Sequence, residues 1–319
     1  MKARQHLRFI SPSSAVLFVS MTAIFGSNDS LAQDYLYGRP LSYDSIHSDS
    51  GIQRRPLATI HNEFAELART HADKADWIQY GASGQGKALM ALRVMNKAWT
   101  SKLTRPAVMI SEGIHGNEYL HITDRLPFEF LKSPSATPNF EHFIATGGVV
   151  YFVPVMNPDG YSAGQRGNAS GADLNRDFQI QAAGNQGFRQ PETKLVTTFV
   201  ATEAKTLNLV VEATMEYHCC IGGLIHPWAW TPQGLTGEPL ARHQAFGEMV
   251  SDILGYPYGT VNDILGYSAV GGSDDYYLET YGRRAFSLEG QRSQEAKRLP
   301  EHVALWERFF GELAQGKKS

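Results

Sequence analysis

Short apolar segments alternate with segments of helical periodicity along the chain, and this alternation constrains the fold more than any other feature of the sequence. The segments typical of strands are residues 76–82, 88–95, 107–111, 148–155, 209–217 and 284–288. Those with the apolar spacing of helices are 56–73, 119–131, 190–207, 239–254 and 301–314. Because helices that alternate with strands cover both faces of a sheet, we expect one α/β domain with a parallel or mixed sheet.

The first residues differ from the rest of the chain. Three Lys and Arg residues stand within the first eight positions, an apolar run follows over residues 15–25, and small residues end at Ala32. This pattern predicts a secretory signal peptide over residues 1–32 and a folded domain over 33–319. The apolar run is short for a bilayer span, although a transmembrane anchor is the alternative interpretation. We therefore expect an exported protein, periplasmic or secreted, without stable membrane insertion.

Charge is evenly spread along the sequence. Charged residues make up 19% and hydrophobic residues 42% of it, and no block of like charge occurs. This composition suits a globular protein with a sizeable core and speaks against a nucleic-acid or membrane-surface partner. Removal of residues 1–32 takes away three positive charges and one negative charge, so the formal net charge would change from −3 to −5. No feature of the sequence indicates the oligomeric state.

The two cysteines, Cys219 and Cys220, are adjacent and cannot link distant segments. Stability must therefore come from the apolar core. We expect two thiols packed in the interior, and a vicinal disulfide is the alternative in an oxidising compartment.

One strand end carries a candidate metal-binding pair. His115 and Glu118 follow the strand over 107–111 and are three residues apart, so a single helical turn puts both on one side. Imidazole and carboxylate are suitable zinc ligands, and a catalytic zinc site needs one more. His218, which follows the strand over 209–217, could supply it. Taken singly, each residue also fits an ordinary surface or core role.

Other strand ends carry polar residues, where ligands of α/β sheets gather. The segment Asn157-Pro158-Asp159-Gly160 predicts a tight turn. A loop rich in Gly and Asn follows it and carries Arg166 and Arg176, which either bind a ligand or are solvated. Glu289 closes the strand over 284–288. It is either a buried general base beside a metal or a carboxylate that turns to solvent.

These segments, in this order, resemble the zinc carboxypeptidase family of pancreatic carboxypeptidases and their bacterial relatives. The shared pattern is His-x-x-Glu, Asn-Pro-Asp-Gly, Asp-x-Asn-Arg, a strand-terminal His, a Tyr before Gly-Gly-Ser, and a strand-terminal Glu. The resemblance extends from about Ser42 to Leu313. It implies a single domain with a mixed sheet of about eight strands and helices on both faces.

The resemblance also implies roles at the reaction centre. His115, Glu118 and His218 would ligate one Zn²⁺ per chain. Asp173 would accept the second ring proton of His115 and fix its tautomer. Glu289 would be the general base, and the remaining catalytic role, stabilisation of the oxyanion, would fall to Arg166.

Further implied roles concern the substrate. Asn175 and Arg176 would hold its terminal carboxylate, and Tyr267 would close over it. Asp274, directly after Gly-Gly-Ser, would lie near the base of the pocket for the leaving side chain. A carboxylate there would favour a basic or amine-bearing residue. Alternatively, Asp274 turns to solvent or pairs with Arg283 or Arg284.

The chain departs from the family pattern in three places. Asp177 follows Arg176 where the family usually has Asn, and an extra negative charge there would weaken carboxylate binding unless it points away. Cys219 and Cys220 replace a Ser and an aromatic residue. The stretch from Asn157 to Arg176 is shorter than in the digestive enzymes and is more similar to relatives that process cell-wall peptides.

The function implied by the resemblance is hydrolysis of the peptide bond next to a free C-terminal carboxylate. The first alternative is an amidase or carboxypeptidase that acts on muropeptides near diaminopimelate, with the same metal site. The others are an inactive binding protein and a small-molecule deacylase on this scaffold. The ligand set and Glu289 speak against the inactive protein, and the complete Tyr and Gly-Gly-Ser segment speaks against the deacylase.

Overall fold

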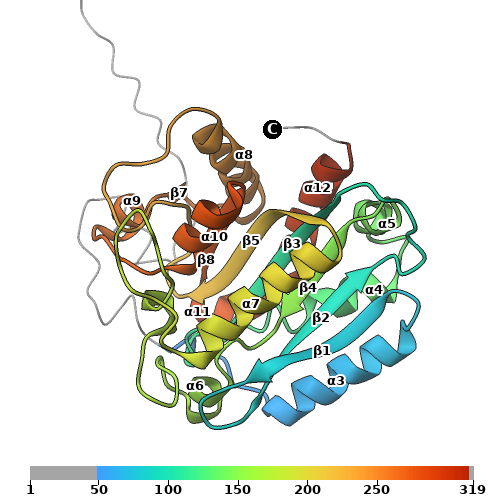
Figure 1. Cartoon of the computed structure of the whole chain (residues 1–319), viewed down its shortest axis with the longest axis horizontal. Helices are drawn as coiled ribbons and strands as arrows, with labels where there is room; N and C mark the ends of the chain where they lie inside the picture. Colours follow the sequence, from blue (N-terminus) through green and yellow to red (C-terminus); the bar gives the residue numbers. More distant parts are fainter. Residues whose placement is uncertain (1–48, 316–319) are drawn as a thin grey trace, which may run out of the picture.

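The structure is a computed structural model that describes residues 49–315 (Figure 1). The predicted signal peptide over residues 1–32 lies outside the described residues, so the structure does not bear on it. Within residues 49–315, no helix combines the length and the apolar character that a bilayer crossing requires.

The predicted α/β domain with a mixed, eight-stranded sheet is confirmed. The strand order is β1-β2-β4-β3-β5-β8-β6-β7. The parallel pairs are β3 with β4, β3 with β5, β5 with β8 and β6 with β7, and the other neighbours are antiparallel. The strands are β1 Ala75–Ala82, β2 Ala88–Met95, β3 Arg105–Glu112, β4 Val149–Val153, β5 Leu209–Cys219, β6 Gly223–Ile225, β7 Tyr258–Gly259 and β8 Arg284–Gly290.

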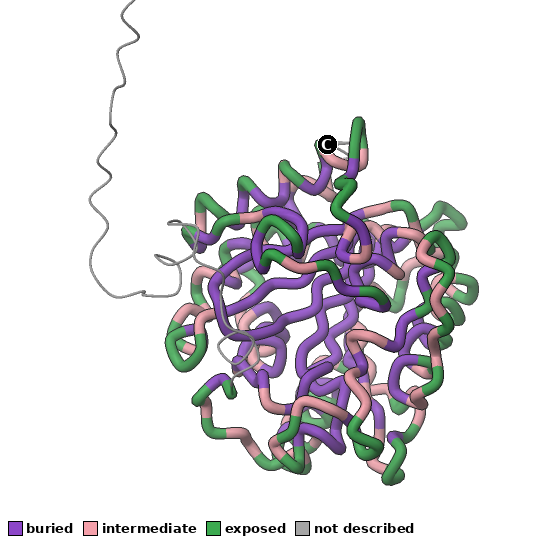
Figure 2. Tube along the Cα trace, turned by 90° about the vertical axis from the view of Figure 1, so that its left-hand side faces the viewer, coloured by how far each residue is buried: buried purple, intermediate pink, exposed green. Residues whose placement is uncertain are grey.

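Helices cover both faces of the sheet. The helices are α3 Leu57–Thr70, α4 Leu126–Lys132, α5 Pro138–Ala145, α6 Pro158–Ala163, α7 Pro191–Thr206, α8 Gly237–Leu254, α9 Val261–Leu265, α10 Ser273–Tyr281, α11 Arg292–Glu295 and α12 Leu299–Ala314. One apolar cluster joins the sheet to α3, α4, α5, α8 and α12, and a second joins it to α7 and α10. Alternate residues of β4 enter the two clusters, which is why its segment is continuously apolar. Figure 2 shows the central strands as a buried layer between exposed helix surfaces.

One predicted helix is wrong over its first part. The helix predicted over residues 119–131 begins only at Leu126, and Pro127 lies in its first turn instead of kinking it. The preceding backbone donates to a buried carboxylate instead: Glu112 accepts hydrogen bonds from the N–H groups of residues 120–123. His121 also has a φ of 64°, which no helix tolerates. Similarly, Asn157 caps the short helix α6 rather than closing a tight turn.

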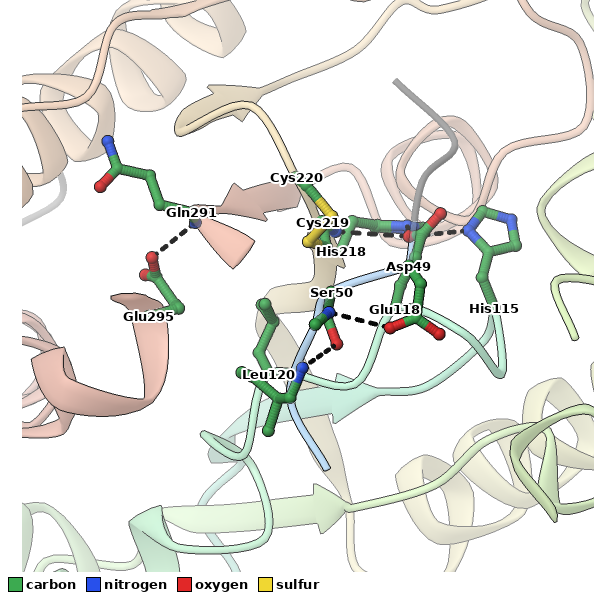
Figure 3. Close-up of a disulfide and its surroundings, with 12 residues drawn as sticks. Asp49, Ser50, His115, Glu118, Leu120, His218, Cys219, Cys220, Gln291 and Glu295 are labelled. Carbon is green, nitrogen blue, oxygen red and sulfur yellow. Dashed lines mark hydrogen bonds and ion pairs between the residues drawn. A yellow bond between two sulfur atoms is a disulfide. The ribbon is translucent and has the colours of Figure 1, made fainter. Parts of the chain in front are cut away.

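The two cysteines form a disulfide (Figure 3). The expectation of two thiols is therefore wrong, and the vicinal disulfide weighed against it is what the structure contains. Both residues are buried, as expected. The disulfide lies at the end of β5, directly after His218.

The departure at Asp177 is explained by its contacts. Its carboxylate accepts the N–H groups of Arg189 (3.0 Å) and Gln190 (2.9 Å), the two residues before α7, and the hydroxyl of Thr193. A negative charge at a helix N-terminus is stabilising. Asp177 thus points away from Arg176 and anchors α7.

We expect Asp177→Ala to lower the free energy of unfolding by about 1–2 kcal/mol, because it removes the acceptor of two partly buried N–H groups and the negative charge at the start of α7. The KM for peptide substrates should stay within about twofold. Asp252→Ala is the control, since Asp252 forms an exposed ion pair with Arg308 and should cost less than about 1 kcal/mol. A marked fall in KM for Asp177→Ala would show that Asp177 repels substrate after all.

Candidate metal centre and active site

Two strand ends bring three possible metal ligands together. The turn after β3 carries His115 and Glu118, and β5 carries His218. One carboxylate oxygen of Glu118, Oε2, lies 3.0 Å from His115 Nδ1 and 3.1 Å from His218 Nδ1 (Figure 3). The donor atoms of the three residues all lie within 4.8 Å of one another, and all three side chains are buried. The three residues predicted as zinc ligands therefore form one compact group.

Asp173 binds the ring nitrogen of His115 that faces away from Glu118. His115 Nε2 lies 2.9 Å from Asp173 Oδ1, and Arg166 donates from Nε (3.1 Å) and Nη2 (3.0 Å) to Asp173 Oδ2. Burial alone would raise the pKa of Asp173, yet the hydrogen bond with His115 and the charge of Arg166 lower it well below its usual value. An ionised Asp173 favours the tautomer of His115 that carries its proton on Nε2, which leaves the lone pair of Nδ1 for a metal ion shared with Glu118.

This donor set fits zinc. Two imidazole nitrogens and one carboxylate oxygen are the ligands of a common type of catalytic zinc site, which leaves the fourth position to water or substrate. The carboxylate that orients His115 is the outer partner such sites require.

The predicted site residues other than Asp173 line a single cavity. Its lining consists of His115, Glu118, Arg166, Asn175, Arg176, His218, Ile225, Ala229, Val261, Leu265, Tyr267, Ala269, Gly272, Asp274, Ser287 and Glu289. These residues are far apart in the sequence, from His115 to Glu289. They meet because β3, β5 and β8 are parallel neighbours whose carboxyl ends lie at one edge of the sheet.

Glu289 is a buried carboxylate next to the metal-binding group. In the sheet register it pairs with His218. Its Oε2 atom has no hydrogen-bond partner among residues 49–315. Burial and the neighbouring carboxylate of Glu118 raise the pKa of Glu289 well above its usual value. Glu216 is a second buried acid nearby, on β5. It accepts a 2.6 Å hydrogen bond from Ser111 and does not line the cavity.

The two arginines that line the cavity, Arg166 and Arg176, have different neighbours. Arg166 Nη1 lies 2.6 Å from Glu118 Oε1, beside the metal-binding group. Arg176 is held by its own loop, since its Nη1 donates to Asn175 O over 2.7 Å. Asn175 Oδ1 accepts the N–H of Ser273 (2.9 Å), which ties this loop to the start of α10. At Gly271, with φ 90°, a Cβ would lie 2.4 Å from the Arg176 carbonyl oxygen, so only glycine allows this close approach.

Asp274 lies inside the cavity and not at the protein surface. It is buried, which raises its pKa, and the positive charge that opposes this rise is that of Arg176. Arg283 and Arg284 form ion pairs with Glu212 instead, at 3.8 and 3.9 Å. Of the alternatives weighed for Asp274, solvent exposure and pairing with these arginines are therefore wrong.

Sequence reasoning missed the apolar wall of the cavity and one polar residue. The wall consists of Ile225, Ala229, Val261, Leu265 and Ala269. It comes mostly from short elements that were not predicted, and no local signal marks it. Ser287 also lines the cavity. It stands two residues before Glu289 on β8, so the alternation of a strand could have found it.

Known proteins share both the sequence pattern and the fold. The family model described as zinc carboxypeptidase matches residues 60–305. Carboxypeptidase M of Mus musculus is 26% identical over 259 residues, which cover 72% of this chain and 56% of that protein. Carboxypeptidase D of Drosophila melanogaster is 28% identical over 196 residues, covering 52% of this chain and 13% of that protein. This chain thus spans about half or less of the length of these curated relatives.

Solved structures with the same fold are more distant in sequence. Bovine thrombin-activatable fibrinolysis inhibitor superposes with a TM-score of 0.67 at 19% identity, covering 83% of this chain and 98% of that one. A metallo-carboxypeptidase from Burkholderia cenocepacia gives 0.63 at 17%, covering 82% and 69%. At these identities the likeness establishes the fold alone. Together with the match of the family model over most of the sequence, it leads to one conclusion: this chain belongs to the zinc carboxypeptidase family.

Proposed function

We propose that the protein is a zinc-dependent metallocarboxypeptidase that hydrolyses the peptide bond next to a free C-terminal carboxylate. The observation that carries the proposal is that one cavity contains a His-Glu-His donor group, a buried carboxylate beside it, and two arginines. These are the parts that hydrolysis of a terminal peptide bond needs.

In this proposal His115, Glu118 and His218 hold the zinc. When bound, zinc supplies a Lewis acid that acidifies water and polarises the scissile carbonyl. Glu289 accepts a proton from the attacking water and delivers it to the leaving amine. Its raised pKa suits a group that must first take up and then release a proton.

The two arginines bind different negative groups, the oxyanion of the reaction and the carboxylate of the substrate. Arg166 stabilises the oxyanion that develops on the scissile carbonyl, since it lies beside the metal donors. Arg176 binds the terminal carboxylate through paired hydrogen bonds, helped by Asn175. Tyr267 lines the same cavity and covers the bound residue.

The cavity wall supports a preference for a basic or amine-bearing leaving residue. Its aliphatic side chains suit a hydrocarbon stem, and Asp274 offers a buried carboxylate to a terminal cation. Diaminopimelate also carries an amine, so a muropeptide is the second candidate substrate. Export of the protein, proposed from its N-terminal sequence, would bring it to either substrate.

Two substitutions should separate metal binding from catalysis. His218→Ala removes a donor, so zinc measured by elemental analysis should fall well below the one ion per chain expected of the wild type. Treatment with a chelator should abolish turnover, and added zinc should restore it. Glu289→Gln keeps all three donors, so it should retain zinc while kcat falls about 10²–10⁴-fold.

The matched control is Glu216→Gln. Burial raises the pKa of Glu216 to about 8, so its carboxyl is largely protonated at pH 7 and glutamine resembles it closely. This variant should keep most of its turnover. Equal zinc content in His218→Ala and wild type would refute the ligand assignment, and an active Glu289→Gln would refute the base.

Cleavage should require the free carboxylate. Amidation of the C-terminus should lower kcat/KM by at least about 10²-fold, because each hydrogen bond between charged groups contributes about 1.5–3 kcal/mol. Arg176→Ala should abolish this difference. The same comparison with purified muropeptides, with and without a free carboxylate on the residue to be released, ranks the two substrate classes. Equal rates for free and amidated peptides would show that the protein is not a carboxypeptidase.

A peptide ending in Lys should be cleaved with a higher kcat/KM than the matched peptide ending in Leu, and Asp274→Asn should lose this preference. Burial raises the pKa of Asp274 to about 6. The carboxylate is charged above that pH and neutral below it, so the Lys-to-Leu ratio should fall as the pH drops through 6. Steps common to both peptides cancel in the ratio. A wild type that prefers Leu, or an unchanged ratio in Asp274→Asn, contradicts the assignment.

A further inference from the structure

The orientation of Glu289 depends on the backbone that carries it. Its Oε2 atom is buried without a hydrogen-bond partner among residues 49–315, so that oxygen has no side-chain anchor. The last residues of β8 pair with β5 up to Gly290, where the strand ends, and with β6 up to Glu289. Because this pairing ends at Gly290, other contacts must hold the chain just beyond it, one residue away from Glu289.

Glu295, on α11, binds this strand end from behind. Its Oε2 accepts the N–H of Gln291 over 2.6 Å (Figure 3) and also the hydroxyl of Tyr256. A Cβ at Gly290 would lie 2.8 Å from Glu295 Cγ, so the acid packs directly against the strand end. Glu295 has no exposed surface.

The other oxygen of Glu295 is connected through His302 and Tyr217 to β5, the strand that carries His218. His302, on α12, lies with Nε2 2.6 Å from Glu295 Oε1 and with Nδ1 3.0 Å from the hydroxyl of Tyr217. The same hydroxyl accepts the indole N–H of Trp306 over 3.1 Å. Tyr217 directly precedes His218 on β5.

The donors and acceptors of this network match when His302 is neutral. Tyr217 donates its hydroxyl proton to His302 Nδ1, and His302 Nε2–H donates to Glu295. Glu295 then receives three donors on its two oxygens. Burial would raise the pKa of Glu295, but the hydrogen bond with His302 lowers it below its usual value. A fully paired buried network of this kind holds its members in one arrangement.

The network lies behind the cavity, and none of its members lines it. It nevertheless reaches both strand ends on which the proposed chemistry depends, because Glu289 and His218 are register partners. We propose that Glu295 and His302 are positioning residues that fix the end of β8 bearing Glu289 and the end of β5 bearing His218. This inference rests on the proposed carboxypeptidase function.

Glu295→Gln tests it, because one oxygen becomes an NH₂ group that faces a donor and breaks one arm of the network. We expect kcat for a peptide substrate to fall about tenfold or more, since small displacements of a reacting group are costly. KM should change less than about threefold, and the zinc content should stay at the wild-type level.

His243→Gln is the matched control. His243 is also a buried histidine that links a helix to β8: its Nδ1 lies 2.7 Å from Pro239 O, and its Nε2 accepts the N–H of Ala285 over 3.2 Å. Ala285 stands at the other end of the strand. His243→Gln should therefore lower the Tm without lowering kcat. A folded, zinc-loaded Glu295→Gln that keeps the kcat of His243→Gln overturns the proposal.

Tyr217→Phe provides a second test that does not depend on the folding of Glu295→Gln. It removes only the hydroxyl that connects His302 to β5, so the affinity for zinc, measured by competition with a chelator, should fall about tenfold. Unchanged zinc affinity and kcat in Tyr217→Phe overturn the role of His302. A wild type that binds zinc but cleaves no peptide refutes the proposed function instead, and the zinc affinity of Tyr217→Phe still decides the positioning role.

Discussion

The active-site cavity depends on the register of three parallel strands. β3, β5 and β8 are neighbours whose carboxyl ends meet at one edge of the sheet, and Glu289 is the register partner of His218. Because side chains alternate along a strand, a shift of one residue between β5 and β8 would turn one of these two groups away from the cavity. The core on both faces of the sheet opposes such a shift, since it would expose buried side chains of both clusters. The packing of the core therefore also fixes the geometry of the site.

The cavity must also balance its buried negative charges. Four carboxylates lie in or directly behind the cavity, those of Glu118, Asp173, Asp274 and Glu289. Among residues 49–315, two guanidinium groups line it, those of Arg166 and Arg176. Buried carboxylates are costly without cations. A divalent ion among the His-Glu-His donors would balance this excess, and a cationic substrate side chain would further offset the charge of Asp274. Burial raises the pKa values of both Asp274 and Glu289, and the neighbouring carboxylate of Glu118 raises that of Glu289 further.

The central strands and long helices could be predicted from the sequence because their signal is local. The segments of β2, β3 and β4 show apolar runs of strand length, and α7 and α8 show helical spacing with nearby turn residues. Residues 119–125 could not be predicted in this way, because their N–H groups bind Glu112, which belongs to another element. The polar site residues were found because they match an ordered pattern. The apolar wall was missed because short elements such as β6 and α9 supply much of it, without periodicity of their own.

The structure also contains a layer that no motif indicates. Glu295 and His302 belong to different helices, and each is unremarkable in the sequence until Tyr217 and Gln291 are seen beside them. Their burial is costly unless every polar atom is paired, and the network pairs them at two strand ends. The residues that line the cavity determine which reaction is chemically possible. The network outside the cavity determines how accurately the ends of β5 and β8 present those residues. Residues of the first kind can be recognised from their order in the sequence, whereas those of the second kind can be recognised only from their contacts.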